Sequence, residues 1–226
     1  MTDTASPRPP IQVAIIPVTP FQQNCSLIWD TATGKAVFVD PGGETDKLLN
    51  VLKENGLTLE QVWLTHGHTD HAGAAQELKE RLGVPVYGPH KDDQFLLDDL
   101  EDSAAKYGLP PCRNCQPDRY FEDGDELALG DLRFKVVHTP GHTPGHVVIY
   151  HDGVRLAFVG DVLFQGSIGR TDFPRGNFEH LIASITEKLW PLGDDMQFVP
   201  GHGPTSTFGR ERQTNPFVSD TALGRA

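Results

Sequence analysis

The 226-residue chain has only three cysteines and no apolar run near the length of a membrane span. Cys25, Cys112 and Cys115 are too few and too irregularly spaced for a disulfide framework, which fits a reducing compartment. A helix that crosses a bilayer needs about 20 apolar residues. The first residues also lack the basic and then apolar pattern of a signal peptide. We therefore expect a cytoplasmic protein with no membrane partner.

Basic residues are scarce compared with acidic ones. Lys and Arg total 19, whereas Asp and Glu total 31, which gives a net charge of −12 at pH 7. Such a charge repels phosphate backbones at long range, so we do not expect nucleic acid as a partner. An anionic small substrate would need a local cluster of Arg or Lys. The composition leaves the oligomeric state open.

The chain is long enough for one large domain, and its pattern predicts strands followed by helices in each half. This order indicates two sheets packed face to face with helices outside. We expect one domain over 11–217, with flexible tails at 1–10 and 218–226. The expected strands are 11–18, 25–29, 36–39, 62–65, 84–87, 126–129, 132–137, 147–150, 155–159 and 196–199, and the expected helices are 45–55, 72–82, 91–107 and 178–190.

One short segment concentrates the chemistry. Thr-His-Gly-His-Thr-Asp-His occupies positions 65–71, between a buried strand and a helix. Residues two apart in an extended segment point the same way, so His66 and His68 can hold one ion. Asp70 and His71 follow after the chain turns and can reach a second point nearby. Imidazole and carboxylate are preferred ligands of Zn²⁺ and similar cations, so this segment predicts a metal site.

Three later segments supply the same ligand types, each after a predicted strand. They are Thr-Pro-Gly-His with His142, Gly-Asp with Asp161, and Pro-Gly-His-Gly with His202. Ends of neighbouring strands converge on one edge of a sheet. Residues far apart in the sequence are therefore expected to share this site.

T-H-G-H-T-D-H, T-P-G-H-T-P-G-H, V-G-D and P-G-H-G, in this order, resemble the metallo-β-lactamase superfamily. The similarity is strongest to its short, single-domain glyoxalase II-like (hydroxyacylglutathione hydrolase-like) branch. It implies an α/β fold, a four-layer αββα sandwich, with two divalent metal ions at one edge. Zinc is the first expectation, and iron or manganese suits the same ligands. The resemblance assigns His66, His68 and His142 to the first metal, Asp70, His71 and His202 to the second, and Asp161 to both.

The same resemblance gives functional roles to residues around the ligands. Asp70 and Asp161 are expected to be catalytic because they hold the metals and the attacking water. We expect His146 to orient a ligand, and Asp40 to do the same or to form a turn. Arg170 is expected to bind a substrate carboxylate, with Arg175 and Arg210 as weaker candidates. For Cys112 and Cys115 we expect an ordinary loop, and any further role stays open.

The expected activity is hydrolysis of an acyl-glutathione thioester, S-D-lactoylglutathione or a related compound, by a metal-bridging hydroxide. A family motif Gly-His-Glu-Tyr-Thr here becomes Gly-His-Gly-Pro-Thr at 201–205, which leaves the acyl group and the thiol open. The main alternative is a persulfide dioxygenase with a single iron at His66, His142 and Asp161. A lactonase and a non-enzymatic metal-binding protein are further alternatives.

Overall fold

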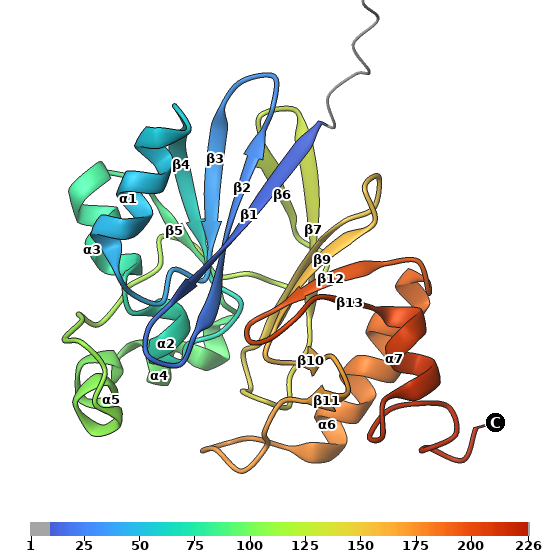
Figure 1. Cartoon of the computed structure of the whole chain (residues 1–226). Coiled ribbons are helices and arrows are strands. Elements are labelled where there is room, and N and C mark those ends of the chain that lie inside the picture. Colours follow the sequence, from blue (N-terminus) through green and yellow to red (C-terminus); the bar gives the residue numbers. More distant parts are fainter. Residues whose placement is uncertain (1–9, 226) are drawn as a thin grey trace, which may run out of the picture.

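The computed structural model describes residues 10–225, which form two large β-sheets, with helices on their outer faces, and one small two-stranded sheet (Figure 1). The first sheet has the order β1-β2-β3-β4-β5 and the second the order β13-β12-β9-β8-β7-β6. The first comprises β1 (Ile11–Val18), β2 (Gln23–Asp30), β3 (Lys35–Val39), β4 (Thr58–Trp63) and β5 (Val86–Tyr87). The second comprises β6 (Glu126–Leu129), β7 (Leu132–His138), β8 (Val147–His151), β9 (Leu156–Gly160), β12 (Gln197–Pro200) and β13 (Ser206–Thr207).

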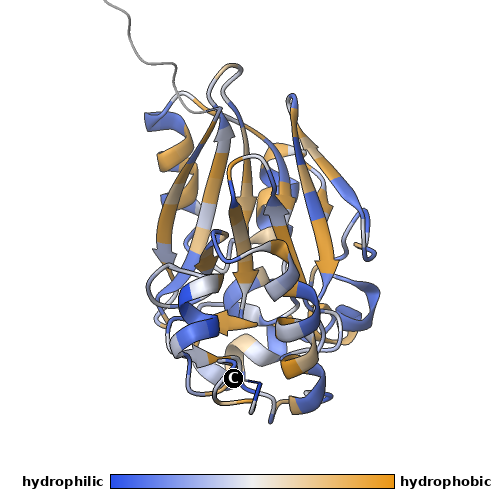
Figure 2. Ribbon diagram, turned by 90° about the vertical axis from the view of Figure 1, so that its right-hand side faces the viewer, coloured by the Kyte–Doolittle hydropathy of each residue, from blue (hydrophilic) through white to orange (hydrophobic). Residues whose placement is uncertain are grey.

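The helices divide between the two outer faces. In Figure 1, α1 (Thr45–Glu54) and α3 (Ala75–Leu82) cover the first sheet, and α6 (Phe178–Ala183) and α7 (Phe208–Thr214) lie beside the second. Apolar residues are concentrated in the strands, as Figure 2 shows by colour. This arrangement confirms the expected αββα sandwich. The remaining elements are α2 (Thr69–Ala72), α4 (Gln94–Leu97), α5 (Leu100–Tyr107), β10 (Leu163–Phe164), β11 (Ser167–Ile168), and the short helical turns η1 (Lys91–Asp93), η2 (Ser184–Leu189) and η3 (Trp190–Leu192).

The central layer of the core is the apolar contact between the two sheets. Trp63 of the first sheet meets Phe134 of the second edge to face, with ring centroids 5.2 Å apart. Both side chains are fully buried, and truncating such an aromatic residue to alanine costs about 3–5 kcal/mol. The position of the sheets relative to each other is therefore set by large, well-packed side chains.

The sheets also join directly at the edge that carries the histidine loops. Gln23 of β2 forms an isolated antiparallel bridge with His202, which follows β12. The backbone N–H of Asn24 donates to the carbonyl of Gly201 at 2.7 Å, and its side chain donates to the carbonyl of Gly203 at 2.8 Å. This seam places the loop after β12 against the first sheet.

Two predicted helices differ from the structure. The segment 91–107 is not one helix but η1, α4 and α5 in succession, because the carbonyl of Leu97 accepts from Cys115 N–H, outside any helix. The helix predicted at 178–190 continues from α6 into a π-helical turn, η2, and a final 3₁₀ turn, η3. The two-residue strands β10, β11 and β13 were not predicted, since so short a run has no detectable alternation.

The described residues of the predicted C-terminal tail make contacts with the domain. Val218 is fully buried with the core of the second half, and the guanidinium of Arg212 pairs with Asp220 at 2.9 Å. A fully buried apolar side chain is stabilised by its removal from water, so this segment packs on the domain. Residues 1–9 of the predicted N-terminal tail lie outside the described residues. Over residues 10–225, no helix is long and apolar enough to cross a membrane.

Candidate metal centre

The histidine-rich loop between β4 and α2 is held in place by Asp40. One carboxylate oxygen accepts from Thr65 N–H at 2.7 Å and the other from Thr65 Oγ1 at 2.6 Å. Asp40 itself follows β3 and adopts a left-handed backbone, with φ of 53°, at the turn that reverses the chain. Two adjacent strand ends of the parallel pair β3–β4 are thus tied together directly below the loop.

The first group of ligand atoms comes from His66, His68 and His142. His68 Nδ1 lies 3.1 Å from His66 Nε2 and 3.0 Å from His142 Nε2. Burial lowers the pKa of all three imidazoles, in the case of His68 to about 3. Each ring is therefore neutral near pH 7 and has a lone pair available for a cation. Three neutral nitrogens this close together are typical of a metal site.

The second group comes from Asp70, His71 and His202. Oδ2 of Asp70 lies 3.2 Å from His202 Nε2 and 3.9 Å from His71 Nε2. Burial favours the neutral imidazole of His71, but the carboxylates of Asp161 and Asp70 raise its pKa well above the usual value. A proton and a metal ion would compete for the same Nε2 atom of His71.

Asp161 lies between the two groups. Its Oδ1 is 3.4 Å from His71 Nε2, and its Oδ2 is 3.7 Å from both His142 Nε2 and His202 Nε2. Burial acts to raise the pKa of this carboxyl group, but the neighbouring His71 outweighs it and holds the pKa well below its usual range. An ionised carboxylate between two nitrogen clusters suits a ligand that is shared by two cations.

The outward-facing nitrogens of these histidines are already engaged. Nδ1 of His71 donates to Asp40 at 2.9 Å, and Nδ1 of His142 donates to the backbone carbonyl of Arg170 at 2.7 Å. Nδ1 of His202 faces the backbone carbonyl of Phe21 at 3.2 Å. Such contacts fix the ring orientation and the tautomer of metal ligands and leave Nε2 directed at the centre.

Two buried atoms at the centre have no hydrogen-bond partner among the described residues. They are Nε2 of His71 and Oδ1 of Asp161. They lie 3.4 Å apart and attract each other as charges, but neither gains the hydrogen bond whose absence costs a buried polar atom about 1–3 kcal/mol. A bound divalent cation would remove this cost, so the residues present fit the predicted metal centre. The donors are nitrogen and oxygen atoms only, which suits zinc, iron or manganese and does not choose among them.

His146 lies beside the centre but directs its ring elsewhere. Its Nε2 accepts from the backbone N–H of Asp161 at 3.1 Å, and its ring stacks on that of His66 with centroids 4.7 Å apart. Neither ring nitrogen is free to bind a metal, because Nδ1 faces Thr139 Oγ1 at 3.3 Å. The structure thus brings all seven predicted ligands together. His146 contacts Asp161 and His66, and Asp40 contacts His71, each on the side away from the centre.

Sequence reasoning missed a further carboxylate, Asp93, which ties the two ligand loops together. Its side chain is fully buried and accepts from Gly67 N–H at 2.9 Å, from Thr143 Oγ1 at 2.7 Å and from Gly145 N–H at 2.6 Å. Gly67 lies between His66 and His68, and Thr143 follows His142. An aspartate in an apparently amphipathic helix gives no sequence signal of this role.

The pH dependence of stability tests the burial of Asp93. Burial raises its pKa to about 6, although the three hydrogen bonds act in the opposite direction. The unfolded chain therefore releases this proton at lower pH than the folded protein, so the stabilisation is complete below about pH 4 and decreases as the pH rises to about 6. We expect the stability advantage of metal-free wild type over Asp93→Asn to fall by about 2 kcal/mol between pH 4 and pH 6, and by about 3 kcal/mol in total well above pH 6, since each pKa unit is worth about 1.4 kcal/mol.

Denaturant unfolding at several pH values measures this difference. The control is Asp92→Asn, at an exposed neighbouring carboxylate, which is expected to follow the wild-type pH dependence. A constant difference between wild type and Asp93→Asn from pH 4 to 6.5 would contradict the prediction.

Arg170 and the cysteines are placed differently from the metal ligands. The exposed guanidinium of Arg170 pairs with Asp172 through two hydrogen bonds of 2.9 and 2.7 Å. Burial raises the pKa of Cys112, and it raises the pKa of Cys115 to about 12, so both groups are thiols near pH 7. The three cysteines are free, so Cys112 and Cys115 do not form a disulfide.

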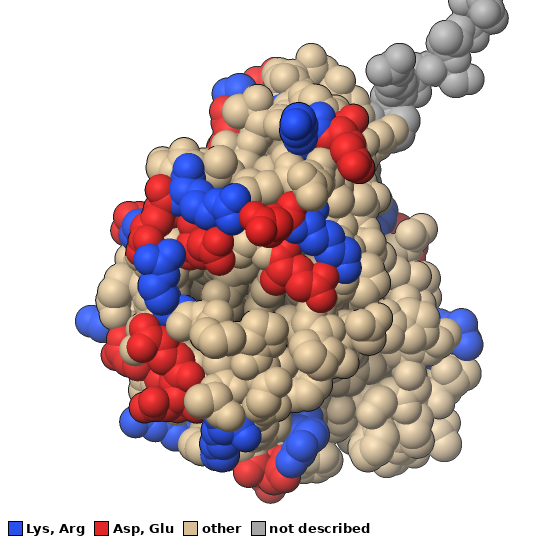
Figure 3. All heavy atoms as spheres, turned by 60° about the vertical axis from the view of Figure 1, so that its left-hand side comes forward, with Lys and Arg blue, Asp and Glu red and all other residues tan. Residues whose placement is uncertain are grey.

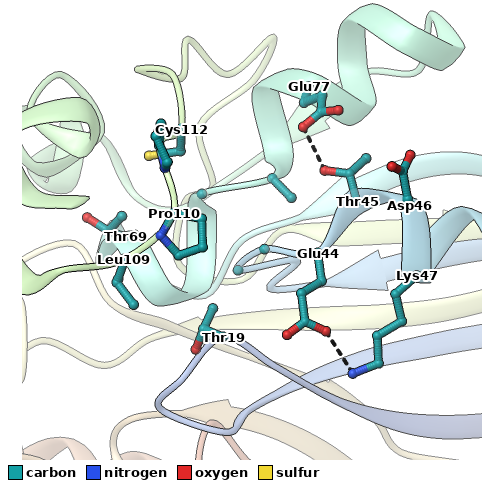
Figure 4. A pocket seen from close by; sticks show the side chains of 15 residues that line it. Thr19, Glu44, Thr45, Asp46, Lys47, Thr69, Glu77, Leu109, Pro110 and Cys112 are labelled. Carbon is teal, nitrogen blue, oxygen red and sulfur yellow. Dashed lines mark hydrogen bonds and ion pairs between the residues drawn. The ribbon is translucent and has the colours of Figure 1, made fainter. Parts of the chain in front are cut away.

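A cavity of about 360 Å³ lies beside α2 and is lined in part by Thr69, Gly73 and Ala74 (Figure 4). None of the seven predicted metal ligands lines it. Two pairs of its polar groups contact each other: Thr45 Oγ1 donates to Glu77 at 2.8 Å, and Lys47 pairs with Glu44 at 2.8 Å, whereas Thr69 Oγ1 has no hydrogen-bond partner among the described residues. The cavity is therefore a feature separate from the metal centre.

A family model described as the metallo-beta-lactamase superfamily matches residues 18–202. The chain belongs to the metallo-β-lactamase superfamily. The match includes the ligand segment of the first half, in the loop after β4, and the three ligand segments of the second half, up to His202. The predicted membership is therefore confirmed, and the superfamily match supports a metal-dependent hydrolase.

Individual relatives place the chain more closely within the superfamily. A protein named hydroxyacylglutathione hydrolase GloC, from Haemophilus influenzae, is 49% identical over 210 residues, which covers 92% of this chain and 99% of the relative. The crystal structure of TTHA1623 in a di-iron-bound form has a TM-score of 0.83 at 38% identity, covering 91% of this chain and all of that one. That of ETHE1 from Myxococcus xanthus has a TM-score of 0.74 at 31% identity, covering 92% and 84%.

Proposed function

We propose that the protein hydrolyses acyl-glutathione thioesters, converting S-D-lactoylglutathione or a related thioester to an acid and a free thiol. The observation that carries the proposal is the convergence of seven ligands in two groups, with Asp161 between them and with unpaired atoms on His71 and Asp161. The relative named as a hydroxyacylglutathione hydrolase, matched over 99% of its length, supports this substrate class. Zinc in both positions is the first proposal, with iron or manganese as alternatives.

The two ligand groups suit this reaction chemically. When bound, a pair of divalent cations lowers the pKa of a shared water to about 7 and stabilises negative charge on a carbonyl oxygen. His66, His68 and His142 would hold the first ion, Asp70, His71 and His202 the second, and Asp161 both. In hydrolysis the water oxygen bonds to the carbonyl carbon, and the carbon–sulfur bond breaks. Because a thiolate is a good leaving group, the protein needs no dedicated general acid.

The charges of the chain's own residues support the same roles. The carboxylates of Asp70 and Asp161 would offset half of the charge of two divalent cations, while the five histidines would bind as neutral groups. Asp40 holds one ligand loop in place by accepting from His71. Asp93 holds two loops together by accepting from the backbone N–H groups of Gly67 and Gly145. The pre-set geometry favours catalysis because little reorganisation is needed when the reacting groups meet.

The alternative is oxidation of a persulfide with a single iron at His66, His142 and Asp161. The likeness to ETHE1 and to a di-iron structure gives this alternative its support. The second group of ligands favours the hydrolase, because Asp70, His71 and His202 are a complete set that a mononuclear enzyme would not require.

One experiment separates the two activities. Purified protein is assayed for metal content, for cleavage of S-D-lactoylglutathione and for oxygen uptake with glutathione persulfide. We expect two metal ions per chain, thioester cleavage and no oxygen uptake. One iron per chain, with oxygen consumption and without thioester cleavage, would replace the proposal by the dioxygenase.

A further inference from the structure

An anionic substrate would need a cation near the metal centre that is not already neutralised. Most Lys and Arg side chains on the face formed by α1 and α3 are mixed with acidic ones (Figure 3). Arg81, for example, contacts both Asp46 and Glu77, at 2.8 and 2.9 Å. Near the metal centre, the two-fold contact with Asp172 neutralises Arg170 in the same way. The residue expected from the sequence to bind a carboxylate is thus already paired with one.

Arg175, five residues later, has no carboxylate partner within residues 10–225. Its guanidinium lies over the ring of Phe95, 4.2 Å from the ring centroid. Stacking on an aromatic face leaves the N–H groups at the edge of the guanidinium free to donate. Arg175 adopts a left-handed backbone, with φ of 63°, inside the turn that is closed where Gly176 N–H donates to the carbonyl of Phe173 at 2.9 Å. This tight turn directs the side chain towards α4.

The contact with Phe95 places Arg175 next to the first ligand group. Phe95 belongs to α4, and its neighbour Leu96 packs on Gly67, where an added Cβ would lie 2.8 Å from that of Leu96. On the other side, the ring of Phe173 lies 4.9 Å from that of His68 and 5.8 Å from that of His142. The loop 169–177 and α4 thus flank the partly exposed His68, and Arg175 connects them.

We propose that Arg175, stacked on Phe95, binds a carboxylate in the thiol half of the substrate and sets the preference for anionic thioesters. The inference rests on the proposed function and adds a specificity residue to it. A planar guanidinium suits this role because it donates two parallel hydrogen bonds to a carboxylate. Because the net charge of −12 disfavours the approach of an anion at long range, an unpaired local cation would favour its binding.

The test compares an anionic with a neutral thioester. Steady-state kinetics are measured with S-D-lactoylglutathione and with the uncharged S-lactoyl-N-acetylcysteamine. In Arg175→Gln, we expect the ratio of kcat/KM for the anionic over the neutral substrate to fall by about 10- to 100-fold, as expected for one charged hydrogen-bonded contact. The change is expected mainly in KM. Arg175→Lys keeps the positive charge but loses the two parallel N–H donors and the stacking on Phe95, so it should give an intermediate ratio.

Two further variants serve as a control and as a test of the competing residue. Arg133→Gln, whose guanidinium donates only to the backbone carbonyls of Gly130 and Leu132, is the matched control and should keep the wild-type ratio. Arg170→Gln tests the competing residue, and we expect less than about a threefold change because its charge is already paired. A larger effect in Arg170→Gln than in Arg175→Gln, or an equal loss for both substrates in Arg175→Gln, would overturn the inference.

A binding measurement separates failure of this inference from failure of the proposed hydrolysis. S-methylglutathione is a thioether that is not cleaved, and calorimetric titration of the metal-loaded protein measures its affinity without turnover. Weaker binding by Arg175→Gln than by wild type supports the carboxylate contact even if no thioester is hydrolysed. Equal binding by both proteins, or no binding by wild type, would overturn it.

Discussion

Asp161→Ala is expected to leave a folded protein that holds less metal and has almost no activity. The carboxylate of Asp161 is the only one among the described residues that faces both ligand groups, with one oxygen directed to His71 and the other to His142 and His202. Its loss should lower turnover by more than the 10- to 100-fold that is typical for a residue that only orients a ligand. Metal analysis of the purified variant, together with the thioester assay, measures both effects.

A matched control for Asp161→Ala is Asp152→Ala, which removes an exposed carboxylate paired with Lys135. This variant should keep metal content and turnover, because exposed ion pairs contribute little to stability. Thermal unfolding of the metal-free proteins shows whether either substitution damages the fold itself. If Asp161→Ala keeps its full metal content, Asp161 does not bridge the two ions.

The second large effect is expected from Gly42→Ala. Gly42 lies where the turn after β3 passes the loop that carries His66 to His71. A Cβ added to Gly42 would lie 1.5 Å from the backbone carbonyl oxygen of Asp70. That oxygen belongs to the backbone, so relief requires a shift of α2 and of the ligands Asp70 and His71. We expect a loss of about 3 kcal/mol or more of unfolding free energy and weaker binding of metal by the second group.

The adjacent variant Gly43→Ala provides the control for Gly42→Ala. A Cβ at Gly43 would meet only the methyl group of Thr19, at 3.2 Å, so a shift of a few tenths of an ångström suffices. Denaturant unfolding with and without metal compares the two variants. If Gly42→Ala unfolds within 0.5 kcal/mol of Gly43→Ala, the close approach of the two loops is not as described.

The convergence of the seven proposed ligands was predictable because each is a metal-binding residue type placed at the end of a recognisable strand. The loop after β4 supplies four of them, and the parallel strands β9 and β12 end next to each other and supply Asp161 and His202. The partners of these residues were less predictable. Asp40 was a candidate because of its Pro-Gly-Gly turn, whereas Asp93 was missed, since nothing in its neighbourhood distinguishes a buried aspartate from an exposed one.

Two other features could not be predicted from the sequence: which side chains pair with each other, and where a helix is interrupted. The charge of Arg170 suggested a substrate contact, but its pairing with Asp172 depends on the local path of the loop. The predicted helix 91–107 is interrupted after Leu97 because the carbonyl of Leu97 accepts from the backbone N–H of Cys115. The hydrophobic periodicity of the sequence gives no indication of this contact. Val218 is buried only because the chain folds back onto the second half, and its sequence neighbours are mostly small or polar.

The seam between Gln23 and His202 has a consequence for the order in which a functional molecule is made. Each ligand group takes residues from both halves of the chain: His142 joins His66 and His68, and His202 joins Asp70 and His71. A half that folds alone therefore offers no complete set. Because a ligand that binds only the native state stabilises that state, metal uptake favours molecules whose two halves have already docked. Metal binding thus distinguishes fully folded molecules from those in which only one half has folded.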